Sequence, residues 1–289
     1  MTLISMLLAL IIERLAVRSD KWQAAGYCRA YVRFSASSKL SLLASNRLGQ
    51  YLWLALPGAV VALLLCLADS HLLSLLVNTL VLLLGIGCWH YRVLYKQYLN
   101  AMDRGDEEAA FISMQQIRSQ MGSTQQQSSY GQLLLWLNFR YYAAVVFWFL
   151  VLSPFGLAAF GVMTYALVRH LQEAVDEQDS ADYAAVLGDD SKINCIAHWA
   201  FWFPARLFGL GFALVGHFSR ASNVLLSYFL DFTADNEQVV VAVATAAETL
   251  PDESLNTLDD SSYMVQLAKR NMLFFLAFTA ILTLTGWLG

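Results

Sequence analysis

Polar and charged side chains interrupt two segments that are otherwise apolar. Asn138 and Arg140 lie within LLWLNFRYYAAVVFW, and Arg206 lies within FPARLFGLGF. A charge at the centre of a membrane helix costs about 2.5 kcal/mol or more, so such residues pair, line a wet cavity or extend to the interface. The guanidinium group of arginine binds carboxylates and phosphates through two parallel hydrogen bonds. The arginines are therefore either interface anchors or parts of a pocket for an anion, and Glu13 is a candidate pairing partner.

The composition requires that these residues be positioned by membrane helices. The 289 residues are 58% hydrophobic and only 14% charged, with a mean hydropathy of +0.50. Apolar stretches of about 18 residues or more are long enough to cross a bilayer as helices. Such stretches lie at Tyr51–Ala68, Leu72–Trp89, Tyr141–Val168, Ile196–Gly216 and Met272–Leu288. We predict an all-α, polytopic integral membrane protein with roughly four to six transmembrane or re-entrant helices and amphipathic cytoplasmic helices.

We treat residues 1–289 as a single membrane domain that begins with a short, retained apolar helix. Ser153-Pro154-Phe155-Gly156 divides one long apolar stretch, which predicts a helical hairpin, with one kinked helix as the alternative. The predicted segments are a basic loop (13–50), a helical hairpin (51–90), a cytoplasmic loop (91–132), an arginine-bearing hairpin (133–168), a loop (169–195), an element around Pro204 (196–217), a mixed segment (218–270) and a terminal helix (271–289).

Charge placement predicts the orientation in the bilayer. Seven Lys and Arg residues lie between Glu13 and Tyr51, which the positive-inside rule assigns to the cytoplasm. The turn Asp69-Ser70-His71 has neither Lys nor Arg and is expected on the outer side. Within 91–132, Asp103–Ser119 has helical spacing, with Ala109, Ile112 and Ile117 toward one side. The net charge of −4, without a basic face, argues against nucleic acid as a partner.

Motifs of soluble enzymes are absent from the sequence. It contains no G-x-x-x-x-G-K-[ST], G-x-S-x-G or H-E-x-x-H motif. The four cysteines form no C-x-x-C pair, and the histidines are separated from one another. We therefore predict no catalytic residue, no metal site and no cofactor.

Two motifs resemble the AmpE family of regulatory membrane proteins associated with β-lactamase induction. WLNFRYY (Trp136–Tyr142) is similar to the family's W-[IL]-N-F-R-[FY]-Y segment. PARL (Pro204–Leu207) with ALVGH (Ala213–His217) is similar to its P-x-R-L…A-L-[IV]-G-H segment, and Asp231-Phe232 and LALIIERL (Leu8–Leu15) also match in order. The polar residues at membrane depth and these motifs give five candidate ligand-binding residues: Glu13, Asn138, Arg140, Arg206 and His217.

The AmpE family is grouped with the CobD/CbiB membrane enzymes, which use ATP to join a corrinoid acid to an aminoalcohol. Pro204–Leu207 reads P-A-R-L as in those enzymes, but Arg140 stands where they carry an aspartate before an A-P-L-F stretch. Their S-P-N-x-G loop is also missing. Because Mg²⁺ prefers carboxylate oxygens, ATP and Mg²⁺ belong only to the alternative in which ligase activity survives.

The resemblance implies a sensor or modulator in the bacterial inner membrane, linked to muropeptide recycling and to the muropeptide amidase AmpD. A residual ligase of CobD/CbiB type is the alternative. A transporter ranks last, because no inverted repeat or pair of broken helices is visible. The sequence leaves the ligand and the oligomeric state open.

Overall fold

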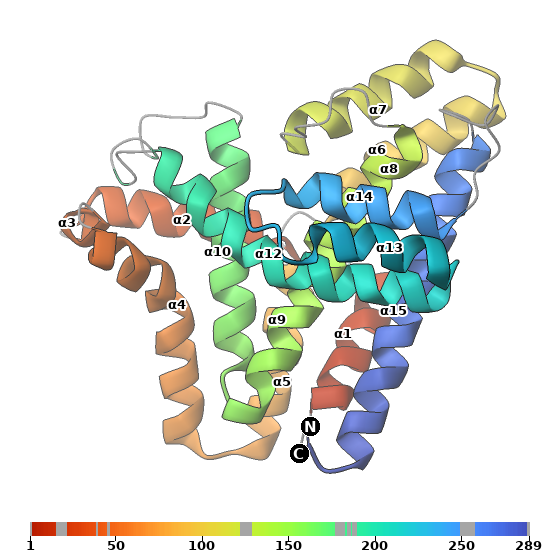
Figure 1. Cartoon of the computed structure of the whole chain (residues 1–289). Coiled ribbons are helices and arrows are strands. Elements are labelled where there is room, and N and C mark those ends of the chain that lie inside the picture. The colour runs from red at the N-terminus through yellow and green to blue at the C-terminus, as the bar shows by residue number, and fades with distance from the viewer. Residues whose placement is uncertain are drawn as a thin grey trace. The chain divides into compact units, whose positions relative to one another are not determined.

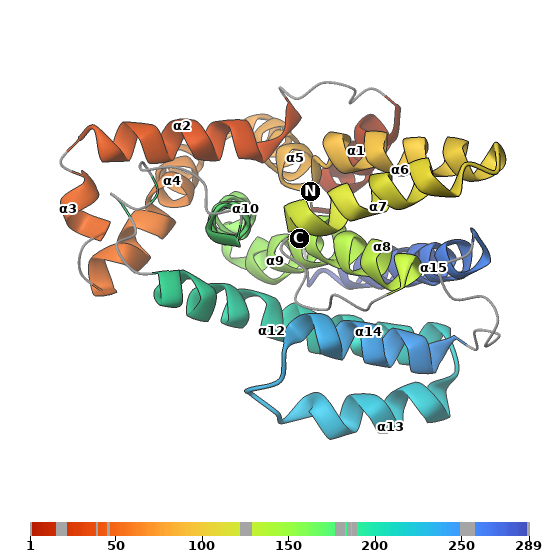
Figure 2. The same cartoon turned by 90° about the horizontal axis from the view of Figure 1, so that it is seen from above.

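Helices form all the regular structure in the described part of the chain, which confirms the all-α prediction (Figures 1 and 2). The computed structural model describes residues 2–15, 22–38, 40–44, 47–121, 129–176, 183, 186, 190–248 and 258–287. Parts of the predicted segments 13–50, 91–132, 169–195 and 218–270 lie outside these residues. Two compact units are present: Met1–Trp89 with Val145–Ala200 and Thr279–Gly289, and His90–Ala144 with Phe201–Phe278.

The first unit is built around α10. Its helices are α1 (Thr2–Leu15), α2 (Ala24–Ala36), α3 (Leu40–Ala44), α4 (Arg47–Ala68), α5 (His71–Ile86), α9 (Ala144–Leu152) and α10 (Ala158–Asp176). Helix α10 packs against α2, α4 and α5, and α1 packs against α5. A Cβ atom on Gly58 would lie 2.9 Å from the carbonyl oxygen of Phe160, so the backbones of α4 and α10 touch. Small residues allow this close approach between helices.

Residues 153–157 reverse the chain between α9 and α10. Ser153–Phe155 form a 3-10 turn, and Gly156 follows with φ 71°, a left-handed conformation that favours glycine. A Cβ on Gly161 would lie 2.9 Å from the carbonyl oxygen of Trp148, so α10 returns along α9. The two helices therefore form a hairpin.

The turn between α4 and α5 lies at the same end of the first unit as the α9–α10 turn and both chain termini (Figure 1). Asp69 has φ 40°, and Ser70 caps α5, its side-chain oxygen accepting a hydrogen bond from the backbone N–H of Leu73 at 3.5 Å. Short turns without Lys or Arg are typical of the side away from the cytoplasm.

The second unit contains helices in segments predicted as a cytoplasmic loop with one helical stretch (91–132), the start of the arginine-bearing hairpin (133–168) and a mixed segment (218–270). They are α6 (Trp89–Asp103), α7 (Glu107–Met121), α8 (Tyr130–Asn138), α13 (Phe218–Phe229) and α14 (Asn236–Ala247), together with parts of α12 (Asp190–Val215) and α15 (Leu258–Leu284). Helices α13 and α14 lie side by side (Figures 1 and 2). A Cβ on Gly209 would lie 2.9 Å from Leu225 and 3.7 Å from Val243, so α12 packs against both.

Of the three residues predicted on one side of helix α7, only Ile117 is buried. The helix is present, but Ile112 is 50% exposed, whereas the buried apolar residues are Ala110, Met114, Ile117 and Met121. Their spacing of four, three and four residues is the regular apolar stripe of a helix that packs on one side.

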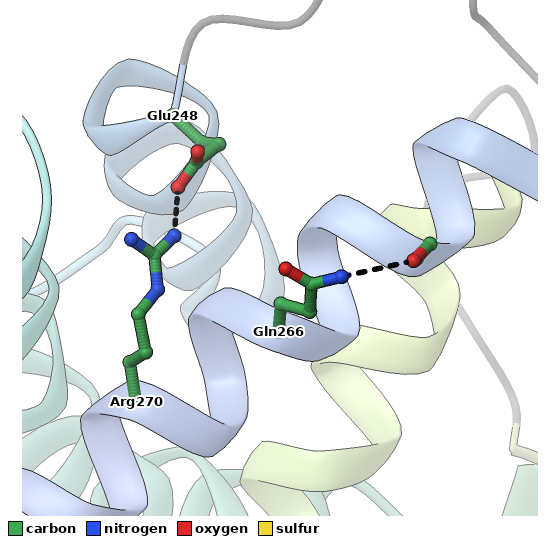
Figure 3. A network of polar contacts seen from close by, with 4 residues as sticks. Glu248, Gln266 and Arg270 are labelled. Carbon is green, nitrogen blue, oxygen red and sulfur yellow. Dashed lines mark hydrogen bonds and ion pairs between the residues drawn. The ribbon is translucent and has the colours of Figure 1, made fainter.

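Helix α15 begins at Leu258, well before the start predicted for the terminal helix. Near its N-terminal end, Gln266 Nε2 donates to Ser262 Oγ at 3.2 Å, and Arg270 forms an ion pair with Glu248, just after α14 (Figure 3). The Arg270 side chain is 46% exposed. An exposed pair of this kind contributes no more than about 1 kcal/mol, so it orients α15 more than it stabilises it.

The described residues include three helical segments long and apolar enough to cross a membrane: Leu48–Ala68, Tyr130–Phe155 and Ser261–Leu284. Helices α5 and α6 meet the same test only together, bent by 45°, which allows a fourth span. The chain is thus a multi-pass membrane protein, at or below the lower end of the predicted number of spans. Helix α12, predicted as a span or re-entrant element, is not among the three; it carries Pro204 and the buried Arg206.

Gly211 on α12 faces Asn271 on α15 so closely that no side chain fits between them. A Cβ there would lie 2.2 Å from Asn271 Oδ1 and 2.8 Å from Phe275 Cε2. Asn271 is fully buried, and its Nδ2 donates to the carbonyl oxygen of Phe208 at 3.1 Å. We expect Gly211→Ala to lower the free energy of unfolding by about 1–3 kcal/mol, because overpacking outweighs the gain in helix propensity. Thermal unfolding in detergent micelles measures the change.

Gly26→Ala is the matched control for this prediction. Gly26 lies within α2, and a Cβ there would meet no atom within 4 Å. Alanine is favoured over glycine inside a helix by about 1 kcal/mol, so this variant should be as stable as the original protein or more stable. Equal midpoint temperatures of thermal unfolding for Gly211→Ala and the unaltered protein would contradict the tight packing of α12 on α15.

Candidate functional site

A π-helical turn interrupts the span Tyr130–Phe155 at Phe139–Ala143, between α8 and α9. Helix α8 starts with a capping box, in which the Ser129 side chain accepts from the backbone of Gln132 and the Gln132 side chain accepts from the backbone of Ser129. The wide turn then places Phe139, Arg140 and Tyr141 in the protein interior. Single π-helical turns within helices are frequent at functional sites. Here the turn coincides with the WLNFRYY motif.

Arg140 is held in place by the end of α7 and by aromatic rings. Its side chain is 2% exposed, and its Nη1 donates to the carbonyl oxygen of Met121, the last residue of α7, at 2.6 Å. The guanidinium carbon lies 5.5 Å from the centre of the Phe201 ring and 6.0 Å from that of Trp136. The last carbonyls of a helix lack partners within it and carry partial negative charge. Arg140 therefore caps α7 with a cation.

Helix α6 contributes the next contacts at the same end of α7. Tyr91 Oη donates to the carbonyl oxygen of Gln120 at 3.3 Å, and the Gln120 side-chain oxygen lies 2.9 Å from His90 Nε2. Two consecutive carbonyls of the last turn of α7 thus receive hydrogen bonds from different elements. This arrangement fixes the end of α7 against both α6 and the π-helical turn.

Helix α6 also contacts the π-helical turn directly. Arg92 Nη2 donates to Tyr142 Oη at 2.5 Å, and the Tyr91 and Tyr141 rings meet edge to face with their centres 5.3 Å apart. Edge-to-face pairs of this kind add about 0.5–1.5 kcal/mol beyond the burial of their area. We call the assembly of His90–Arg92, Gln120–Met121 and Arg140–Tyr142 the α7-end site.

Asn138 lies two residues before Arg140 in the chain. Its side chain is half-buried, and its Oδ1 atom has no hydrogen-bond partner among the described residues. A buried amide oxygen without a partner costs about 1–3 kcal/mol. Asn138 and Arg140 are thus neighbours in one segment, as predicted, but only Arg140 contacts the end of α7.

Arg206 forms hydrogen bonds with the turn that connects α13 and α14. Its side chain is 3% exposed, and its Nη1 donates to Asn236 Oδ1 at 2.7 Å. Its Nη2 donates to two backbone carbonyl oxygens, of Asp231 at 2.8 Å and of Tyr228 at 3.5 Å. The guanidinium carbon lies 4.5 Å from the centre of the Trp202 ring. Burial lowers the pKa of Arg206, and the charge of Asp231 opposes that shift. All three of these hydrogen bonds from the guanidinium group go to uncharged oxygens, one of an amide side chain and two of backbone carbonyls.

The turn that Arg206 binds is organised by Asp231. The Asp231 carboxylate accepts hydrogen bonds from the Thr233 hydroxyl at 2.7 Å, the Thr233 N–H at 2.9 Å and the Ala234 N–H at 3.1 Å. The Thr233 hydrogen bonds are the main reason that the pKa of Asp231 lies below its usual range, and Arg206 adds to the effect. The Phe232 ring stacks on Trp202, with ring centres 5.1 Å apart. Asp231-Phe232, noted in the sequence, thus belongs with Arg206.

The two remaining candidate residues lie elsewhere. Glu13 is 4% exposed on α1, in the first unit. His217 is the N-cap residue of α13; its side chain is exposed, and its backbone N–H donates to the carbonyl oxygen of Ala247 at 2.8 Å. The contacts thus group Arg140 with the α7-end site and Arg206 with the α13–α14 turn, while His217 lies at the other end of α13.

Sequence reasoning missed a third buried arginine, in the first unit. Arg169 is 3% exposed on α10, and its Nη1 donates to the carbonyl oxygen of Gly85 at 3.1 Å. His170 Nε2 lies 2.8 Å from Tyr183 Oη, and burial lowers the pKa of His170 to about 4, with Arg29 and Arg169 adding to the shift. The signal in the sequence was an Arg-His pair directly after the apolar stretch that ends at Val168. The sequence did not indicate Gly85 as the acceptor, because every residue has a backbone carbonyl.

Within the described ranges, no three His, Cys, Asp or Glu side chains lie close enough together to hold a metal ion. The chemistry that the α7-end site and the Arg206 turn offer is hydrogen bonding from buried cations to backbone and amide oxygens. Such contacts fix the positions of helices relative to one another.

Comparison with known proteins extends the motif resemblance to the whole chain. Residues 1–289 match the family described as regulatory signalling modulator protein AmpE. Protein AmpE of Shigella flexneri is 28% identical over 296 residues, and the match covers 99% of each chain. No solved structure matches the chain. The chain belongs to the AmpE family of regulatory signalling modulator proteins.

Proposed function

We propose that this protein modulates β-lactamase expression from the bacterial inner membrane and is linked to muropeptide recycling and to the amidase AmpD. The observation that carries the proposal is family membership over the full chain, residues 1–289. The multi-pass architecture agrees with action at a membrane. The relative that matches is also named AmpE and has nearly the same length.

We infer that the α7-end site is where the membrane span and the helices before it are coupled. Arg140 lies in the span but donates to Met121 on α7, and Tyr142 beside it receives a hydrogen bond from Arg92 on α6. Any shift of the π-helical turn would change these contacts, because a hydrogen bond weakens steeply with distance and angle. A ligand or partner that binds α6 or α7 could in this way act on the span.

The arrangement around Arg140 supports regulation over ligase chemistry. In the related ligases an acidic residue occupies this position, whereas here a buried cation faces a carbonyl oxygen and aromatic rings. Mg²⁺ would be repelled by the guanidinium group that stands where those ligases carry the acidic residue. One N–H of Arg140 Nη1 is used by the Met121 carbonyl, and a guanidinium group carries five N–H donors, so an anionic ligand would compete with that carbonyl only if it bound the same nitrogen.

Deletion of the gene in its own host tests the proposed function. We expect altered β-lactamase induction or an altered pool of anhydro-muropeptides, with growth and corrinoid synthesis unchanged. Purified protein given ATP, Mg²⁺, a corrinoid acid and aminopropanol, free or phosphorylated, should form no amide. Unchanged induction and muropeptides would contradict the proposal, and amide formation that Arg206→Leu abolishes would favour the ligase.

The proposed orientation places the α4–α5 turn outside the cytoplasm. Single cysteines replacing Ser37, Ser70 and Ser119, all exposed, should be introduced into a chain stripped of its four cysteines. We expect a membrane-impermeant thiol reagent to label only the Ser70→Cys protein in whole cells, because the basic segments remain inside. Broken cells serve as the control, in which all three should react. Labelling of Ser37→Cys or Ser119→Cys in intact cells would invert the orientation.

A further inference from the structure

We propose that a cavity in the first unit holds part of the acyl chain of a membrane phospholipid. The cavity has a volume of about 120 Å³ and lies among α2, α4, α5 and α10. Its lining residues include no residue of the α7-end site, of the Arg206 turn or of the candidate residues from the sequence. The inference therefore stands apart from the regulatory role proposed above.

The cavity exists because α4 and α5 are held apart. Helix α10 packs against both of them, and Gly58 on α4 and Gly85 on α5 are points of close approach to it. A Cβ on Gly85 would lie 2.6 Å from Val162 Cγ1 on α10. Pro57 on α4 and Leu84 on α5 line the space left between the helices, and α2 closes it from another side.

The walls are suited to hydrocarbon. They consist mainly of aliphatic side chains, including Val81, Val162 and Leu167. Among the polar lining groups, Tyr31 Oη donates to the carbonyl oxygen of Trp53 at 2.9 Å. Burial raises the pKa of the Cys28 thiol to about 12, so that group is uncharged. An apolar cavity of about 150 Å³ stays dry and binds a small hydrocarbon, and this cavity is of similar size.

The position of the cavity indicates that the hydrocarbon comes from the bilayer. Tyr27 lines the cavity and is 59% exposed, so the space reaches the protein surface beside α2. Helix α4, which supplies Pro57, contains a membrane span whose exposed side chains Val60, Leu63 and Leu67 are apolar. Lipid chains therefore cover the outer face of α4, and one of them can enter the neighbouring cavity without crossing water.

Helix α2 has the character of a helix at the membrane surface. It exposes Arg29 and Arg33 together with Tyr27 and Phe34. Basic and aromatic residues on one amphipathic helix favour the interface between head groups and acyl chains. A phospholipid with its head group at α2 would have its chains at the depth of α4 and α5.

A photoreactive phospholipid tests the proposal on the full chain. The protein is reconstituted into lipid nanodiscs containing phosphatidylcholine with a diazirine on the acyl chain, irradiated, and mapped by peptide mass spectrometry. We expect crosslinks at cavity residues on α5 and α10, such as Leu84 and Ala166, in addition to those on the outer face of α4. The absence of crosslinks at cavity residues in the unaltered protein would overturn the proposal, whatever the variants do.

Ala166→Phe fills the cavity, and Ala59→Phe is its matched control, because Ala59 is exposed on α4 and does not line the cavity. We expect Ala166→Phe to lower the cavity crosslinks about tenfold relative to those on α4, and Ala59→Phe to leave that ratio unchanged. If Ala166→Phe folds poorly, Ala24→Leu, which fills the cavity from α2, replaces it in the experiment and should lower the cavity crosslinks in the same way. An unchanged ratio in folded filling variants, or stronger labelling by a diazirine-bearing polyprenol than by the phospholipid, would contradict a phospholipid acyl chain as the occupant.

Discussion

Arg140→Leu is expected to speed amide hydrogen exchange in the last turn of α7 by about 10- to 100-fold. The variant removes the cation that donates to the Met121 carbonyl at 2.6 Å. A hydrogen bond to a charged group contributes about 1.5–3 kcal/mol, and 1.4 kcal/mol corresponds to a factor of ten. The free carbonyl would also lose the favourable interaction of a positive charge with the helix C-terminus. Exchange followed by mass spectrometry of peptides covering Met114–Met121 measures the effect.

Arg104→Leu is the matched control for this experiment. Arg104 is also an arginine of the second unit, but it is exposed and its Nε donates to the carbonyl oxygen of Asn100, one turn earlier. The Arg104→Leu variant should leave the rate of amide hydrogen exchange in α7 unchanged. Arg140→Lys keeps the charge but loses the planar group that packs on aromatic rings, so an intermediate rate is expected. Equal exchange in Arg140→Leu and the unaltered protein would show that Arg140 does not hold α7.

Arg206→Ala is expected to lower the stability of the second unit by about 3–5 kcal/mol. The substitution removes the donors at 2.7 Å from Asn236 Oδ1 and at 2.8 Å from the carbonyl oxygen of Asp231, which keeps only a longer hydrogen bond from Trp202 Nε1 at 3.3 Å. The loss of hydrogen bonds from a charged donor and the lost packing on Trp202 both add to the cost. Thermal unfolding together with limited proteolysis of the Leu230–Asp235 turn reports the change.

Substitution by lysine separates two roles for Arg206. One ammonium group cannot serve both the Asn236 side chain and the α13–α14 turn in the geometry of the planar fork, so Arg206→Lys should recover only part of the stability. Arg220→Ala, at an exposed position on α13, is the control and should cost less than about 1 kcal/mol. Full stability of Arg206→Lys would contradict the bidentate role. Full regulatory activity of that variant would exclude an anion gripped by Arg206.

The membrane spans were predictable where apolar side chains run without interruption. Leu48–Ala68 contains the predicted stretch Tyr51–Ala68, and Ser261–Leu284 overlaps the predicted stretch Met272–Leu288, because a helix that crosses the bilayer needs about 20 mainly apolar residues. Helix α12 was harder to assign. Its exposed face is apolar at Phe203, Leu207 and Leu210, but the opposite side carries the buried Arg206. Hydropathy averages these two faces and does not separate them.

The candidate site was predictable only in part, because its partners are distant in sequence. Arg140 was identified from its apolar surroundings, but the acceptor is a backbone carbonyl at Met121, and every residue carries one. The π-helical turn that directs Arg140 inward has no signature in residue type. The same holds for Arg206, whose acceptors at Asp231 and Asn236 depend on how α13 and α14 return to α12.

Complementation of a deletion strain tests most directly whether the α7-end site carries the regulatory role. The strain receives the unaltered gene, Arg140→Leu or Arg104→Leu, each tagged and compared at equal amounts in the membrane. Because leucine is favoured over arginine at membrane depth, Arg140→Leu should insert at least as well as the original. β-Lactamase activity after addition of an inducing β-lactam is the measurement. We predict that the original and Arg104→Leu restore the normal response and Arg140→Leu does not; full restoration by Arg140→Leu would contradict the account.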